Sequence, residues 1–363
     1  MTTVENFKLR DNHSISRVIK GGWQLAGDHG SVDRQSAIAD MEAFLDAGIN
    51  TFDCADIYVG VEEMIGEFIA DIRKRRGAEL ADSVSVHTKL VPDLSRLHDL
   101  THIEVEAIID RSLKRLQIDQ LHLVQFFWWD MALGNPVKSL EILKRLQEKG
   151  KIKNLGVTNW DIPNTKQFSD AGFDIVSNQV QYSILDRRAE NGLSHWSQEN
   201  NMHLICFGVL AGGFLTENWL GKPDPGFQFE NRSLIKYRLI IDECGSWDHF
   251  QTLLKAMKNI GEKYGVGLSA VAIRYVLERP NVAATIVGAR YARHLPATLE
   301  AFKFTLDADD YAILNPIIEG NGPKGPIFGL EGDRNGRHGS IMKYNLNNDP
   351  NAKTAKDENG DQN

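Results

Sequence analysis

The sequence of 363 residues has few cysteines, no excess of basic residues and no long apolar run. Its three cysteines are scattered and lack the spacing of a metal site or a disulfide framework, which favours a reducing compartment. A net charge of −8 argues against nucleic acid and anionic membranes as partners. No apolar run approaches the roughly 18–20 residues of a transmembrane helix, and residues 1–14 lack the apolar core of a secretory signal. We therefore expect a cytoplasmic protein without nucleic-acid, membrane or metal partners; the oligomeric state has no signal in the sequence.

Short apolar runs alternate with amphipathic helical segments along most of the chain. An alternating pattern over residues 7–16, around Asp11-Asn12, predicts a hairpin. Further strands are predicted at residues 17–23, 49–53, 84–90, 121–127, 153–159, 175–182, 203–208 and 283–287. Helical segments between the strands predict a parallel sheet, and eight such units over about 280 residues favour closure into a (β/α)8 TIM barrel.

The rest of the chain divides around this barrel. We expect residues 1–319 to form a single (β/α)8 barrel domain with the N-terminal hairpin, interrupted by a long insertion at about residues 216–244. Residues 320–346, rich in Gly, Asn, Asp and Lys, are predicted to form a C-terminal extension over the barrel mouth. Residues 347–363 lack large apolar side chains, so we expect them to be a disordered tail.

Polar side chains follow two neighbouring strands where those strands end. Asp53 and Tyr58 come just after the second strand of the barrel, and Lys89 ends the third. Because such ends converge on one site in a β/α barrel, the three side chains are expected to meet. A phenol has a pKa near ~10 in water, and a nearby ammonium lowers it. The three would then form a general acid, although Lys89 and Asp53 as a structural ion pair is an alternative interpretation.

Later strand ends carry residues suited to a dinucleotide. Thr158-Asn159 and Gln179 could hydrogen-bond a carboxamide, and Phe207 could stack on a nicotinamide ring. The turn at residues 208–213 offers backbone N–H groups to a pyrophosphate. Arg290 and His294, near the start of the last helix, could contact a 2′-phosphate. As alternatives, these amides are ordinary loop residues and Phe207 is part of the core.

The order and spacing of several motifs resemble the aldo-keto reductases over residues 7 to about 302. The motifs are GGWQ, NTFDCADIY followed by VEEMIGEF, HTK, KIKNLGVTNW, SNQVQYSILDR and IVGAR. The resemblance implies a (β/α)8 barrel that binds NAD(P)H across its C-terminal face without a Rossmann domain. It also implies that the hairpin closes the barrel bottom.

The resemblance also assigns roles to individual positions. The cofactor-binding residues it implies are Thr158, Asn159, Gln179, Phe207, Gly208, Leu210, Gly288, Arg290 and His294. Arg290 and His294 fall near the 2′-phosphate site, which favours NADP, while NAD stays open as an alternative. The substrate pocket is expected to contain Trp23, Phe127, Trp128 and Trp129.

One position departs from the family pattern. The family carries an Asp, Tyr, Lys, His tetrad, and Asp53, Tyr58 and Lys89 match its first three members. In the segment DQLHLVQFFWWD at residues 119–130, the histidine position is occupied by Phe127. His122 lies five residues upstream, inside the strand, and reaches the same place only if the register slips. We therefore expect a true substitution, with Tyr58 as the only obvious acid.

The favoured hypothesis is an NADP-dependent oxidoreductase that reduces a small-molecule aldehyde or ketone, with Tyr58 as general acid. Phe127 leaves alternatives open. One is reduction of an activated C=C bond, and another is a non-catalytic NADP-binding or sensing protein. A third is a lyase or isomerase that uses Tyr58 and Lys89 without net hydride transfer.

Overall fold

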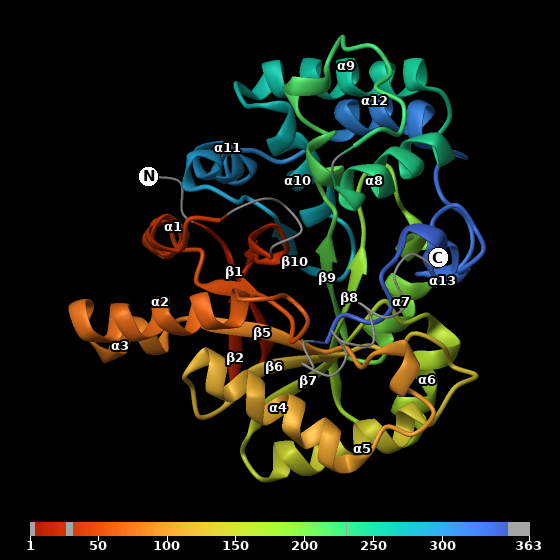
Figure 1. Cartoon of the computed structure of the whole chain (residues 1–363). Helices are drawn as coiled ribbons and strands as arrows, with labels where there is room; N and C mark the ends of the chain where they lie inside the picture. Colours follow the sequence, from red (N-terminus) through yellow and green to blue (C-terminus); the bar gives the residue numbers. More distant parts are fainter. Residues whose placement is uncertain (1–3, 27–31, 230, 348–363) are drawn as a thin grey trace.

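The computed structural model describes residues 4–26, 32–229 and 231–347. A closed barrel of eight parallel strands forms its centre, in the order β10-β3-β4-β5-β6-β7-β8-β9 (Figure 1). The strands are β3 (Val18–Gly21), β4 (Thr51–Asp53), β5 (Ser85–Leu90), β6 (Leu121–Phe126), β7 (Ile152–Thr158), β8 (Ile175–Gln181), β9 (His203–Phe207) and β10 (Val282–Val287). The predicted (β/α)8 barrel is confirmed.

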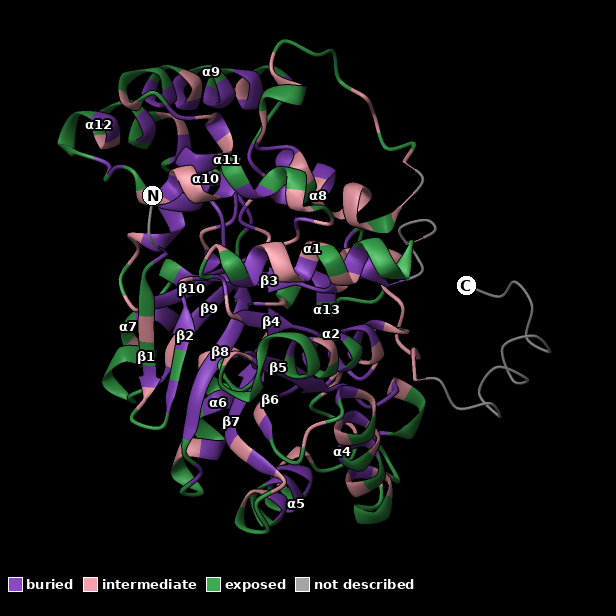
Figure 2. Ribbon diagram, turned by 90° about the vertical axis from the view of Figure 1, so that its left-hand side faces the viewer, coloured by how far each residue is buried: buried purple, intermediate pink, exposed green. Residues whose placement is uncertain are grey.

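Helices pack around the outside of the barrel, and their outer faces are exposed (Figure 2). They are α1 (Arg34–Asp46), α2 (Val61–Arg76), α3 (Ala78–Asp82), α4 (His102–Leu116), α5 (Pro136–Glu148), α6 (Ile162–Asp170), α7 (Leu193–Glu199), α8 (Arg232–Glu243), α9 (Trp247–Tyr264), α10 (Leu268–Leu277), α11 (Leu295–Leu299), α12 (Ala308–Ile318) and α13 (Gly329–Gly332). The strands are buried almost throughout, because one face of each fills the barrel and the other packs against helices.

Local sequence signals set the ends of several helices. The side chain of Asp33 accepts a hydrogen bond from the Ser36 backbone N–H at the start of α1. Thr101 and Glu104 form a reciprocal capping box at the start of α4. These polar caps start each helix just after a loop, so that its apolar face lies against the strands.

The hairpin of β1 (Asn6–Arg10) and β2 (His13–Ser16) covers the N-terminal end of the barrel. Leu9 and Ile15 are buried there against apolar side chains of the barrel interior. His13 enters the same interior, where its Nε2 lies 3.0 Å from Nε2 of His87 on β5, and its ring lies 6.3 Å from that of His122 on β6. We call these three residues the histidine cluster. It lies inside the barrel on the N-terminal side of the ion pair, with His87 two residues before Lys89 on β5.

Two segments outside the regular barrel reach the opposite, C-terminal end. The insertion at residues 216–244 contains α8, and the chain after α12, blue in Figure 1, returns to the barrel as α13 and the loops around it. We call residues 326–347 the C-terminal strap. The prediction of a disordered tail at 347–363 falls, beyond residue 347, outside the described residues.

Candidate active site

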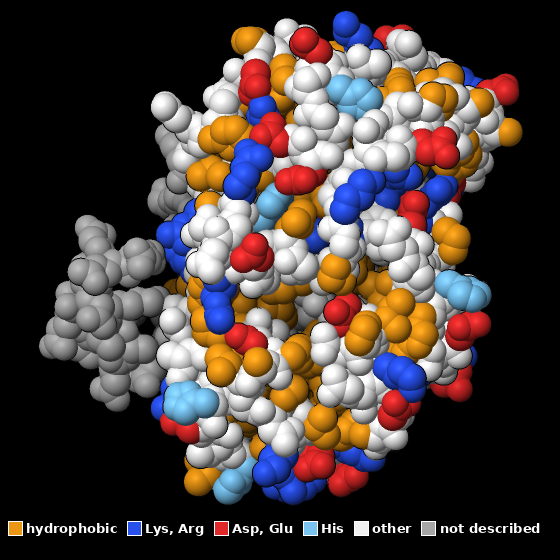
Figure 3. All heavy atoms as spheres, turned by 90° about the vertical axis from the view of Figure 1, so that its right-hand side faces the viewer, with side chains coloured by type: hydrophobic (Ala, Val, Ile, Leu, Met, Phe, Trp, Pro, Cys, Tyr) orange, Lys and Arg blue, Asp and Glu red, His pale blue; other side chains and the backbone are white. Residues whose placement is uncertain are grey.

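A cavity of about 830 Å³ lies at the C-terminal ends of the strands. This volume is at the upper end of the ~300–1,000 Å³ found for small-molecule sites. Hydrophobic side chains gather around a hollow on one face of the molecule, with lysine and arginine side chains nearby (Figure 3). The predicted site residues that line the cavity are Trp23, Asp53, Tyr58, Lys89, Phe127, Trp129, Thr158, Asn159, Gln179, Phe207, Gly208, Leu210, Gly288, Arg290 and His294.

A buried ion pair forms the floor of the cavity. The Lys89 ammonium donates to both carboxylate oxygens of Asp53, at 2.9 and 2.8 Å, and to the backbone oxygen of Cys54 at 2.7 Å. Asp53 and Lys89 are 4% and 5% exposed, so solvent screens their attraction little. The Gln179 amide donates to Asp53 at 2.6 Å, and the Gln125 amide does so at 3.3 Å. These hydrogen bonds fix the ammonium at one point below the cavity.

Tyr58 lies beside this ion pair and is half-buried. The Lys89 Nζ atom is 5.0 Å from the centroid of the Tyr58 ring. Burial raises the pKa of Tyr58 to about 12, although the charge of Lys89 acts in the opposite direction. The expectation of a net lowered pKa was therefore wrong, because loss of hydration outweighs the attraction of the ammonium for a phenolate. Tyr58 holds its proton at neutral pH, as a proton donor must.

A second buried network lies behind the loop that carries Tyr58. Thr88, next to Lys89, donates to Glu62 at 2.7 Å, and Glu62 also accepts from Arg115 at 3.2 Å. Arg115 donates in addition to the backbone oxygen of Asp56 at 3.1 Å. The network thus ties both ends of the tyrosine loop to the strand of Lys89. Sequence reasoning missed it, since the side-chain direction of Glu62 at the start of α2 is not evident from the sequence.

Phe127 and Trp129 form an aromatic wall of the cavity. Their ring centroids are 4.6 Å apart in an edge-to-face arrangement, and Phe127 meets Phe328 of the strap in the same way at 5.3 Å. Trp128 does not line the cavity, so its assignment to the substrate pocket was wrong. Successive side chains point to opposite sides here, and Trp128 packs on Phe126 and donates to the Leu133 backbone oxygen at 3.0 Å.

The histidine nearest in sequence to the tetrad position lies elsewhere. His122 is the second residue of β6, and its Nδ1 accepts a hydrogen bond from the backbone N–H of Val86 at 3.2 Å. It belongs to the histidine cluster and does not line the cavity. At the end of β6 the cavity is therefore lined by the phenyl ring of Phe127, and β6 contributes no imidazole to it.

Glycines line another part of the cavity. Gly208 has φ of +75°, and a Cβ added to it would lie 2.8 Å from the hydroxyl of Tyr237. A Cβ on Gly288 would lie 2.3 Å from the Gln24 amide. The Thr158 hydroxyl donates to the backbone oxygen of Gln179 at 2.9 Å, so it links β7 to β8. At both positions the side chain of Tyr237 or Gln24 occupies the place that a Cβ would need, so only glycine fits.

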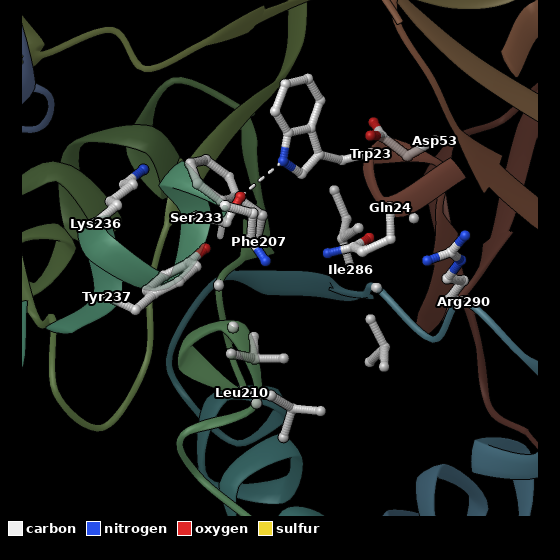
Figure 4. A pocket seen from close by; sticks show the side chains of 18 of the residues that line it. Trp23, Gln24, Asp53, Phe207, Leu210, Ser233, Lys236, Tyr237, Ile286 and Arg290 are labelled. Atoms are coloured by element: carbon white, nitrogen blue, oxygen red, sulfur yellow. Dashed lines mark hydrogen bonds between the residues drawn. The ribbon is translucent and has the colours of Figure 1, made fainter. Parts of the chain in front are cut away.

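Helix α8 contributes residues that sequence reasoning did not identify. Ser233, Lys236 and Tyr237 line the cavity, and Trp23 donates to the Ser233 hydroxyl at 3.0 Å. Figure 4 shows this hydrogen bond reaching from Trp23 to α8, with Tyr237 on the same side as Ser233. The Lys236 ammonium is 5.1 Å from the centroid of the Phe207 ring. In the sequence, only the length of the insertion indicated that residues of α8 could reach the cavity, and length gives no side-chain positions.

Two further findings bear on the type of site. Among the described residues, no group of three or more His, Cys, Asp or Glu side chains is arranged to hold a metal ion. No helix in the described part of the chain is long and apolar enough to cross a membrane.

The family model of the aldo/keto reductase family matches residues 17–319. The aldo-keto reductase YhdN of Bacillus subtilis is 29% identical, over 86% of this chain and 93% of its own. An aryl-alcohol dehydrogenase of Pestalotiopsis microspora is 28% identical, over 80% of this chain and 74% of its own.

Solved structures share the fold. A glycerol dehydrogenase of Gluconobacter oxydans has a TM-score of 0.73 at 23% identity, with 89% of this chain and 97% of its own covered. An aldo-keto reductase of Klebsiella pneumoniae in complex with NADPH has a TM-score of 0.66 at 21% identity, with 90% and 99% covered. The match of the family model over most of the chain, together with the barrel and its cavity, shows that this chain belongs to the aldo/keto reductase family of oxidoreductases.

Proposed function

We propose that this chain is an NADP-dependent reductase of an aldehyde or ketone, with Tyr58 as the general acid. The observation that carries the proposal is the Lys89–Asp53 ion pair beneath Tyr58 in the cavity. A phenol whose pKa is raised to about 12 holds its proton at neutral pH. The fixed ammonium stabilises the phenolate that remains after the proton is given to the carbonyl oxygen.

The cavity has features that suit NADP. The Klebsiella relative binds NADPH in its structure. Gly208 and Gly288 line the cavity with backbone alone, and glycine turns of this kind let phosphates approach the backbone. The Gln24 side chain also lines the cavity, and its oxygen is buried without a hydrogen-bond partner among the described residues.

Each side chain then has one task. When bound, the cofactor supplies the hydride. The residues proposed to hold the cofactor are Asn159, Phe207, Gly208, Leu210, Gly288, Arg290 and His294. Arg290 and His294 would lie toward the 2′-phosphate. Gln179 serves mainly to orient Asp53, since its amide donates to that carboxylate at 2.6 Å. Trp23, Phe127 and Trp129 offer the carbonyl compound an apolar site that excludes water. Aromatic carbonyls suit such walls, and one curated relative is named an aryl-alcohol dehydrogenase.

The test is NADPH oxidation with a panel of aromatic and aliphatic aldehydes and ketones. Tyr58→Phe is expected to lower kcat by about 10²–10⁴, the usual contribution of a positioned acid, while NADPH binding, followed by fluorescence, stays unchanged. Tyr264→Phe removes a phenol on α9 that does not line the cavity and serves as the matched control. Turnover unaffected by Tyr58→Phe would show that another group supplies the proton.

Phe127 supports a second candidate, a non-catalytic NADP-binding or sensing protein. Its ring is 5% exposed and packed edge-to-face between Trp129 and Phe328, so it offers the carbonyl oxygen no hydrogen bond. NADPH binding without turnover on any carbonyl or activated C=C substrate, and activity gained by Phe127→His, would favour this candidate. Turnover by the unmodified protein rejects it.

A further inference from the structure

The C-terminal strap is fixed to the barrel at its start by a buried ion network. Arg188, just after β8, donates to both oxygens of Glu331 on α13, each at 2.9 Å. The same guanidinium donates to the Asp186 carboxylate at 3.0 and 2.7 Å. Arg188 and Glu331 are each 2% exposed and Asp186 is fully buried. The guanidinium therefore joins two carboxylates that are far apart in sequence.

The other end of the strap is fixed beside strand β5. One oxygen of the Asp93 carboxylate accepts from the backbone N–H groups of Leu346 and Asn347, at 2.7 and 3.0 Å. The backbone N–H of Leu94 donates to the backbone oxygen of Tyr344 at 2.9 Å. The strap lines the cavity with Phe328, just before the first attachment, and with Ile341, Met342 and Lys343 between the two. The strap is therefore a wall of the cavity, held at both ends.

Phe328 is the strap residue that meets the aromatic wall. Its ring lies edge-to-face to Phe127 at 5.3 Å and at 6.3 Å from Trp129. Its backbone has φ of +63°, a conformation that a bulky residue rarely adopts and that its surroundings must impose. Phe328 is three residues before Glu331 and immediately precedes α13. The Arg188 contact to Glu331 is thus close enough to fix the position of the ring.

The main effect of this buried ion network is to fix the relative positions of its three residues. Taking charges out of water offsets most of their attraction, so apolar residues of the same size stabilise a fold equally well. A bidentate guanidinium contact, in contrast, allows only one arrangement of its partners. The arrangement is independent of pH near neutrality, because burial, which raises the pKa of Glu331, is outweighed by Arg188 and Lys236, which lower it to about 2.

We propose that Arg188 and Glu331 are positioning residues for substrate specificity, which hold Phe328 against Phe127 so that the cavity selects flat, aromatic carbonyl compounds over small aliphatic ones. The inference rests on the proposed reductase function. An aromatic substrate ring would lie against the cavity side of the wall that Phe127, Trp129 and Phe328 form by packing on one another. A short aliphatic aldehyde would cover little of this wall and would not reach Phe328 of the strap.

The experiment compares kcat/KM for naphthaldehyde and propanal in Glu331→Gln, Phe328→Ala and the double variant. Each single change is expected to lower the value for naphthaldehyde about tenfold, mainly through KM, and to leave propanal within about twofold. Because both residues act through one ring, the double variant should lose no more than Phe328→Ala alone. Glu319→Gln, an exposed glutamate at the end of α12, is the matched control and should match the unmodified protein.

Two results would overturn the proposal: equal losses for both substrates, or losses in the two single variants that multiply in the double variant. If Glu331→Gln does not fold, Phe328→Leu still tests it, because leucine keeps an apolar wall without the ring. Naphthaldehyde binding, read by quenching of tryptophan fluorescence, needs no turnover. If the protein shows no turnover but Phe328→Ala weakens the quenching by naphthaldehyde, the proposed function is contradicted and the role of the strap is supported. If Phe328→Ala leaves the quenching unchanged, the role of the strap is refuted.

Discussion

We predict that acid lowers the free energy of unfolding of this barrel through protonation of the histidine cluster. Burial, with smaller contributions from His122 and Lys153, lowers the pKa of His13 from 6.5 to about 4. Burial, followed by His13, His122 and Lys89, also holds the pKa of His87 well below its usual range. The folded protein therefore keeps these rings neutral at pH values where the unfolded chain takes up protons. The contribution of these neutral rings to the free energy of unfolding is complete above about pH 6.5 and is lost as the pH falls toward 4.

The size of the effect for His13 follows from its two pKa values. A shift from 6.5 to about 4 corresponds to about 3.4 kcal/mol in full, at about 1.36 kcal/mol per pH unit. About 2 kcal/mol of this is lost by pH 5 and about 3 kcal/mol by pH 4. His13 is 3% exposed, so solvent screening reduces these values little. Such a loss is a large part of the ~5–15 kcal/mol that stabilises a typical domain.

Urea unfolding followed by tryptophan fluorescence between pH 7 and pH 4 would measure this loss. His13→Gln keeps a polar side chain but cannot take up a proton, so its free energy of unfolding should fall less steeply with acid than that of the unmodified protein. His195→Gln removes a histidine on α7 whose side chain is 78% exposed, and should leave the slope unchanged. Identical pH profiles for His13→Gln and the unmodified protein would refute the reasoning.

Two further predictions concern glycines. Gly66→Ala would place a Cβ 2.3 Å from the Arg115 backbone oxygen, where α2 crosses α4, and should cost about 1–3 kcal/mol of unfolding free energy in urea titrations; no change would mean that the two helices separate freely. Gly208→Ala, at φ of +75° and against Tyr237, should weaken NADPH binding in a fluorescence titration about tenfold or more, while Gly150→Ala, with φ of +80° in an open loop, should not.

The barrel and the meeting of Asp53 with Lys89 could be predicted from sequence because both follow from local rules. Apolar runs and caps locate strands and helices, and parallel strands bring their C-terminal ends to one edge. The alternation of side-chain directions, which continues past the end of β6, could have excluded Trp128, whose neighbours Phe127 and Trp129 face the cavity. His122 was expected inside its strand, and the structure places it there.

Long-range partners could not be predicted in this way. Arg188 and Glu331 are separated by 143 positions, and nothing near either residue indicates the other. Ser233 and Tyr237 lie in an insertion whose path depends on packing and not on a repeated pattern. The direction of the pKa shift of Tyr58 also depends on how much water the folded loop excludes. Each of these features comes from tertiary packing, which single-sequence patterns do not encode.

The high pKa of Tyr58 sets the pH dependence of the proposed chemistry in its two directions. Alcohol oxidation would require the phenolate to remove a proton, and with a pKa of about 12 only about one molecule in 10⁵ carries a phenolate at pH 7. Carbonyl reduction draws instead on the protonated form, which nearly every molecule holds. The rate of alcohol oxidation is therefore expected to rise with each unit of added alkalinity, up to the pKa of Tyr58.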